Sequence, residues 1–93
     1  MSEEQAHHLL LYDYVDDMQE RRGPYRDAHL ARIRAERDAG RIVSAGALGD
    51  PPRGGAIVFR GVDRGTIEEF VRGDPYVEAG LVTGWRLEPW KLV

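Results

Sequence analysis

The chain has 93 residues, which is enough for one domain and too few for two independent hydrophobic cores. Hydrophobic residues make up 42% of the chain and charged residues 31%, which excludes a disordered, collagenous or coiled-coil protein. The formal net charge of -3 argues against a nucleic-acid-binding domain, and the absence of cysteine excludes disulfides and thiol catalysis. No apolar run approaches the length of a membrane span, and the acidic N-terminal sequence is unlike a signal peptide. We therefore expect a cytoplasmic protein with a single domain over residues 1–93.

The secondary structure is predicted from the spacing of apolar residues and turn formers. In chain order, the pattern predicts flexible residues at 1–6, a strand over 7–14, a short helix over 16–22, a helix over 24–39, strands over 41–48 and 56–60, a helix over 63–72 and a strand over 82–88. Pro24 suits the first turn of a helix, and Gly40 is a natural stop. Asp63 can cap the helix that follows it, and Pro89 is expected to end the last strand.

This order of elements is β-α-β-β-α-β, the split βαβ or ferredoxin-like arrangement of the α+β class. It places both helices on one face of a four-stranded antiparallel sheet. Leu10 and Tyr12 alternate with Leu9 and Leu11 along the first strand, so both sheet faces are apolar. A large exposed apolar face is rare on a soluble monomer, which favours a homodimer that pairs sheet against sheet. Alternatively, the second face lines a ligand groove covered by the C-terminal residues 90–93.

Two polar residues stand out, and each has a structural and a functional interpretation. His29 lies at the edge of the Leu30–Ile33 stripe of helix 24–39, where it is a buried core histidine or a site residue. Asp74 precedes Pro75, where it is the N-cap of a short helical turn or a site residue. The three histidines lack the spacing of a metal site, and the glycines do not form a phosphate loop. We expect no metal and no cofactor.

Four segments resemble the YCII-related (YciI-like) family. They are residues 26–30 (R-x-x-H-L), 40–46, 74–81 (Asp-Pro-Tyr-Val-x-Ala-Gly-Leu) and 89–90. The resemblance implies a ferredoxin-like subunit of a dimeric α+β barrel, with an active site centred on His29 and Asp74. One class of the family removes chloride from a chlorinated hydroxyhydroquinone. The sequence departs from the family at Gly46-Ala47, where the family often has Gly-Pro after the second strand, so one wall of the site is expected to differ.

A histidine and an aspartate can together move protons without a covalent nucleophile. In such a site His29 and Asp74 are the catalytic candidates, Arg26 can hold a carboxylate or phenolate, and Tyr76 can donate to a developing oxyanion. Ser44, in the second matching segment, is a further substrate-binding candidate. These residues favour a cofactor-free lyase or isomerase for a small acidic or phenolic compound. The alternatives are a non-catalytic ligand-binding or regulatory module, and a structural dimerisation domain in which the pair is sealed from solvent.

Overall fold

The structure is a computed structural model that describes residues 6–93. Its elements are β1 (His7–Tyr14), α1 (Met18–Arg21), α2 (Gly23–Asp38), β2 (Ile42–Leu48), β3 (Gly54–Arg60), α3 (Arg64–Arg72), α4 (Pro75–Glu78) and β4 (Val82–Trp90). The order of strands and long helices is the predicted one, and the short turn after Asp74 forms α4. Flexibility was expected at residues 1–6, and residues 1–5 lie outside the described part of the chain.

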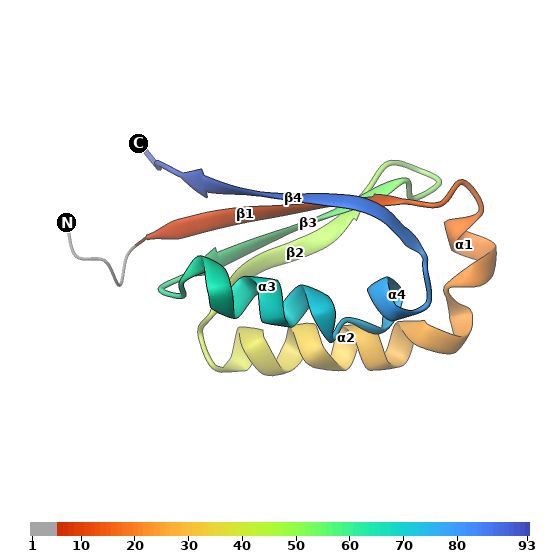
Figure 1. The fold of residues 1–93 in the computed structure, drawn as a ribbon, viewed down its shortest axis with the longest axis horizontal. Helices are drawn as coiled ribbons and strands as arrows, with labels where there is room; N and C mark the ends of the chain where they lie inside the picture. Colours follow the sequence, from red (N-terminus) through yellow and green to blue (C-terminus); the bar gives the residue numbers. More distant parts are fainter. Residues whose placement is uncertain (1–5) are drawn as a thin grey trace.

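The four strands form one antiparallel sheet in the order β2-β3-β1-β4. The central strand β1 pairs with β3 on one side and with β4 on the other. Helices α2 and α3 lie side by side on one face of this sheet (Figure 1), and α4 follows at the end of α3. This arrangement confirms the predicted ferredoxin-like α+β fold.

The main core fills the space between the sheet and the two long helices. Alternation along β1 directs Leu10 and Tyr12 to this side, where both are buried. The amphipathic helix α3 contributes its buried stripe, Ile67, Phe70 and Val71. A second cluster, made of the buried residues Met18, Tyr76 and Leu81, packs near α1 and α4. The burial of apolar side chains on this one face therefore holds the helices against the sheet.

Strands β3 and β4 are longer than predicted, and β2 begins at Ile42 rather than at residue 41. Gly54 and Gly55 were expected in a loop but begin β3, where they pair with β1 and where the space beside them admits no side chain. A Cβ on Gly54 would lie 2.5 Å from the Tyr12 carbonyl oxygen, and one on Gly55 would lie 2.6 Å from the Tyr14 hydroxyl. Strand β4 continues past Pro89 to Trp90, since it is an edge strand, where a missing N–H is tolerated.

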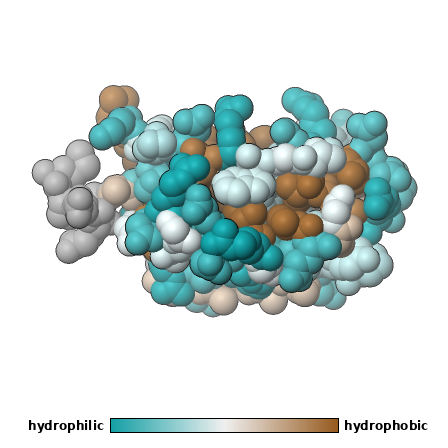
Figure 2. All heavy atoms as spheres, viewed as in Figure 1, coloured by the Kyte–Doolittle hydropathy of each residue, from teal (hydrophilic) through white to brown (hydrophobic). Residues whose placement is uncertain are grey.

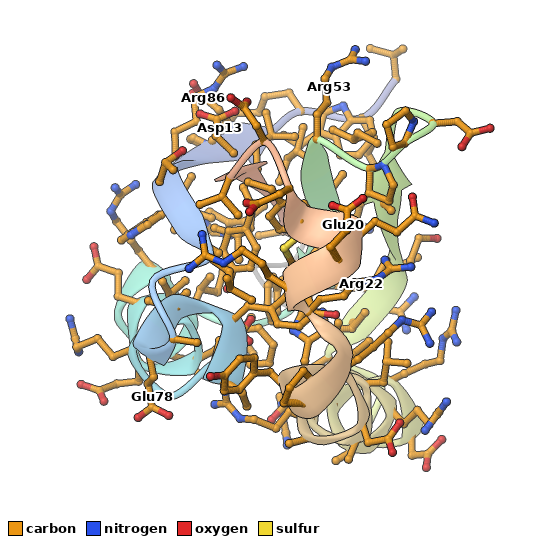
Figure 3. All side chains as sticks on the ribbon, turned by 90° about the vertical axis from the view of Figure 1, so that its right-hand side faces the viewer. Asp13, Glu20, Arg22, Arg53, Glu78 and Arg86 are labelled. Atoms are coloured by element: carbon orange, nitrogen blue, oxygen red, sulfur yellow. The ribbon has the colours of Figure 1, made fainter. Side chains whose placement is uncertain are left out.

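The sheet face turned away from the helices carries partly buried apolar side chains. The register pairs Leu9 with Val58 and Leu11 with Ala56, and all four alternate with residues of the core. Charged side chains border this face; Figure 3 shows Asp13 and Arg86 at the side opposite the helices. A separate apolar area, ringed by hydrophilic side chains, lies between β4 and the helices α3 and α4 (Figure 2). Within residues 6–93, no helix has the length and hydropathy needed to cross a membrane.

Candidate active site

Helix α2 positions His29 toward the sheet. Most of this helix is polar, and its two buried residues are His29 and Ile33, one turn apart. His29 is 6% exposed, so the imidazole ring is almost withdrawn from solvent. A buried polar ring requires a hydrogen-bond partner, and this partner comes from a segment 45 residues further along the chain.

Asp74 is the N-cap of α4 and also the partner of His29. Its Oδ1 accepts a hydrogen bond from the Tyr76 backbone N–H at 3.0 Å and lies 2.9 Å from His29 Nδ1. Its Oδ2 accepts from the Tyr12 hydroxyl at 2.8 Å. The side chain is buried, and three donors therefore replace the water that a carboxylate loses on burial. The capping and pairing roles, considered separately in the sequence, coexist in one carboxylate.

The hydrogen bond to Asp74 defines which ring nitrogen of His29 is available. An ionised carboxylate only accepts, so Nδ1 carries a proton in this contact. In the neutral ring, Nε2 then holds a lone pair and can accept a proton. Asp74 thereby orients the imidazole and selects the tautomer suited to a general base.

Tyrosine rings complete the surroundings of His29. The Tyr76 ring stacks on the imidazole, with centroids 3.8 Å apart and planes 12° apart. Tyr14 meets Tyr76 edge to face, with centroids 6.0 Å apart. Burial raises the pKa of Tyr14 to about 12, with Tyr76 and Asp74 adding to the effect. Burial and Asp74 also raise the pKa of Tyr12, so both phenols remain protonated donors at neutral pH.

A cavity of about 310 Å³ opens beside His29, between α2 and the sheet. Its lining comprises Tyr12, Tyr14, Arg22, Arg26, His29, Leu30, Ile33, Arg34, Arg37, Ala45, Gly46, Ala47, Gly55, Ile57 and Tyr76. Small residues of β2 and β3 face the helix here and leave the space open. Figure 3 shows Arg22 extending from the junction of α1 and α2 toward the side of β2.

The predicted site residues divide into three groups. His29, Arg26 and Tyr76 line the cavity, and Asp74 lies behind His29. Ser44 does not reach the cavity: it pairs with Val58 on the opposite side of the sheet, while its neighbour Ala45 faces the cavity. The Tyr76 ring contacts His29 through its face, which the sequence did not indicate.

Several lining residues were missed in the sequence. Tyr12 and Tyr14 share the strand face of Leu10, so alternation along β1 contained a signal for them. The spacing along helix 24–39 places Arg37 on the same side as Arg26 and His29, but Arg37 was not chosen as a site residue. Arg22 and Arg34 were missed. Ala47, at the position where the family often has proline, is part of the cavity wall. In the described part of the chain, no three His, Cys, Asp or Glu side chains gather as metal ligands would.

Comparison with known proteins agrees with this fold. Residues 6–91 match the YCII-related domain. A similar solved structure is the 5-chloro-2-hydroxyhydroquinone dehydrochlorinase TftG from Burkholderia phenoliruptrix AC1100, in complex with 2,5-dihydroxybenzoquinone. It superposes with a TM-score of 0.80 at 21% sequence identity, over 94% of this chain and 95% of the dehydrochlorinase. No curated protein sequence matches the chain. The YCII-related match spans nearly the whole chain, and the protein therefore belongs to this family.

Proposed function

We propose that the protein is a cofactor-free enzyme that transfers protons on a small acidic or phenolic compound, in an elimination or an isomerisation. One observation carries the proposal: His29 Nδ1 lies 2.9 Å from a buried carboxylate, and His29 lines an open cavity. A pair with only a structural role would be expected in a sealed core. Here Asp74 is sealed, while its partner His29 borders space for a ligand.

In the proposed reaction His29 Nε2 removes a proton from the substrate. The electron pair of the broken bond to hydrogen forms a new double bond. In an elimination, the bond to the leaving group breaks, and that group departs as an anion with its electron pair. In an isomerisation, His29 returns the proton to a different carbon. Both routes balance in protons and electrons without an added oxidant or reductant.

Negative charge that develops on the substrate meets donors in the cavity. Arg26 lies one helical turn before His29, and Arg22 lies one turn before Arg26. Both guanidinium groups lower the pKa of Tyr76 against the larger effect of burial, which places positive charge near that phenol. The Tyr14 hydroxyl, protonated at neutral pH, is a further donor for an oxyanion. A phenolate or carboxylate is the group that these side chains suit.

The structural relative supports the class of reaction. TftG is named as a dehydrochlorinase of a hydroxyhydroquinone, which is a phenolic ring, and its ligand in the solved complex is a dihydroxybenzoquinone. The shared fold makes chlorinated hydroxyhydroquinones the first compounds to test. The alternative is a regulatory or ligand-binding module with the same cavity, which binds such compounds and does not convert them.

The test measures chloride release and ring absorbance on a panel of chlorinated hydroquinones and small ring acids. The wild-type protein should convert one or more members of the panel, and His29→Gln should lose about 10²–10⁴-fold in kcat. Arg21→Gln is the matched control, because Arg21 is exposed, pairs with Asp17 and does not line the cavity. Ligand binding without turnover would support the regulatory module. Unchanged turnover in a folded His29→Gln protein would contradict the proposal.

Self-association is part of the same proposal. The apolar face that Leu9, Leu11, Ala56 and Val58 form lies away from both helices. A two-fold pairing of this face would bury it, with a total interface above about 1,000 Å². Sedimentation should give twice the chain mass of 10.5 kDa, and Leu11→Arg should shift the protein toward the single chain. A 10.5 kDa wild-type species at micromolar concentration would contradict the dimer. A cytoplasmic location is also proposed, and cell fractionation tests it.

A further inference from the structure

The cavity beside His29 is positively charged although the chain carries a net charge of -3. Four arginines line the cavity, and no aspartate or glutamate does. These four are Arg22, Arg26, Arg34 and Arg37. Five other arginines, outside the cavity, each pair with a carboxylate: Arg21, Arg41, Arg64, Arg72 and Arg86. Across residues 6–93, the arginines of the cavity form no ion pair with a carboxylate.

The four arginines occupy two separate places along the cavity. Arg22 and Arg26 lie near the His29 end, and Arg34 and Arg37 lie in the second half of α2. Arg26 and Arg34 are eight residues apart, which corresponds to about 12 Å along a helix. The first pair is near the stacked rings of His29 and Tyr76, while the second pair is more than a helical turn beyond them.

The middle of the cavity is apolar and open. Leu30 and Ile33 of α2 face Ile57 of β3 across it, and the small residues Ala45, Gly46 and Ala47 provide the wall at β2. An extended ligand can therefore reach both pairs of arginines with its central part in contact with apolar side chains.

We propose that the substrate carries two acidic groups separated by an apolar body, and that Arg34 and Arg37 bind the group remote from the reacting atoms. This inference rests on the proposed function in one respect, that the reacting end lies at His29. Four unpaired positive charges repel one another around a cavity, and two anions remove that repulsion. A single-ring phenol at His29 would leave the second pair of arginines without a partner.

Binding tests the inference without any need for turnover. The probes are biphenyl-4-carboxylate and biphenyl-4,4'-dicarboxylate, which share one apolar skeleton and differ in the second acid. In titration calorimetry the wild-type protein should bind the dicarboxylate about tenfold more tightly than the monocarboxylate. The double variant Arg34→Gln/Arg37→Gln should lose this preference and keep its affinity for the monocarboxylate.

Arg60→Gln is the matched control because it removes one exposed positive charge outside the cavity. Within residues 6–93, the only hydrogen bond of the Arg60 side chain is a long one, 3.5 Å, to the Gly40 carbonyl oxygen. This variant should retain the wild-type preference for the dicarboxylate. A wild-type protein that binds neither probe or binds both equally would overturn the inference, as would a preference that survives in the double variant.

The outcomes separate this inference from the proposed function. A preference for the dicarboxylate in a protein that converts no ring compound would leave the two-anion inference standing and the enzymatic proposal without support. Turnover of single-ring phenols with equal binding of the two probes would support the enzymatic proposal and overturn the two-anion inference. His29→Gln should keep the preference, since Arg34 and Arg37 remain in place.

Discussion

Two aspartates of this chain are N-caps with extended backbone angles, and they differ in the partners that their carboxylates have beyond the cap. Asp63 caps α3 by accepting a 2.8 Å hydrogen bond from the Thr66 backbone N–H. Asp74 caps α4 by accepting a 3.0 Å bond from the Tyr76 backbone N–H. Both have extended backbone angles, as N-cap residues generally do. In sequence each is an aspartate at the start of a helical segment.

The surroundings of Asp63 and Asp74 differ in burial and in the number of hydrogen-bond donors. Asp63 is exposed, and the hydrogen bonds from Thr66 lower the pKa of its carboxyl. Asp74 is 1% exposed and has two further donors, His29 and Tyr12, from positions 45 and 62 residues away. A cap becomes a candidate site residue when the fold surrounds it with long-range partners.

Asp74→Asn should have the largest effect, because the carboxylate is buried among three donors. The amide keeps the volume but has a single acceptor oxygen, so one buried donor loses its partner. We expect the free energy of unfolding to fall by about 2 kcal/mol. We expect kcat to fall by about 10²–10⁴-fold with little change in KM, because a neutral amide no longer stabilises the positive charge that His29 gains when it takes the substrate proton.

Chemical denaturation and steady-state kinetics on the active compound measure these two effects. A merely structural Asp74 would lower stability and leave kcat and its pH profile unchanged in the folded fraction. That result would assign Asp74 the same role as Asp63.

The predictable features of this site are those that local sequence determines. The periodicity of helix 24–39 placed His29 on the inward side, and Asp-Pro predicted the start of a short helical turn. The meeting of His29 with Asp74 was expected from the resemblance to the family together with the predicted packing of the two helices. The hydrogen bond between Asp74 and Tyr12 was not expected. It depends on where β1 lies relative to α4, which no local pattern specifies.

The position of Ser44 illustrates a second limit of sequence patterns. A strict alternation from the buried Ile42 would place Ser44 on the side of the helices. The pairing of β2 with β3 shifts between these two residues, so Ile42 pairs with Phe59 and Ser44 with the adjacent Val58. This irregularity turns Ser44 to the opposite face. Nothing in the residue types of β2 predicts this shift in register. In the same way, the residue types of Gly54 and Gly55 did not predict that they begin a strand.

Tyr12→Phe should have the next largest effect on stability and turnover, because it removes one of the long-range donors that distinguish Asp74 from Asp63. The variant removes the donor to Asp74 Oδ2 and keeps the ring, so a buried carboxylate oxygen loses its hydrogen bond. We expect the free energy of unfolding to fall by about 1–2 kcal/mol, with a loss of turnover smaller than in Asp74→Asn. Tyr25→Phe is the control, because Tyr25 is exposed and the structure gives its hydroxyl no hydrogen bond. Equal stabilities of the two variants in urea titrations would show that the Tyr12 bond contributes nothing.

Tyr14→Phe should change the response to alkali. The pKa of Tyr14 rises from 10.0 to about 12 through burial and the nearby Tyr76 and Asp74. Between these values the unfolded chain has released its proton and the folded protein has not, so stability is complete below pH 10.0 and declines as the pH rises through about 12. The variant lacks this titration, and its stability should fall less steeply over the same range. Identical slopes for variant and wild type in urea unfolding at alkaline pH would contradict the assignment.

Asp63→Ala should have the smallest effect and completes the comparison. It removes the acceptor for the Thr66 N–H at an exposed helix end, where water can replace the lost bond. Because the folded-state pKa of Asp63 is lowered, its contribution is present above the unfolded pKa and is lost as the pH falls through the folded value. The stability difference between wild type and variant should therefore shrink in acid, and turnover and probe binding should stay at wild-type levels. A fall in turnover comparable to that of Asp74→Asn would show that both caps support the site through the fold, and the pairing with His29 would no longer distinguish them.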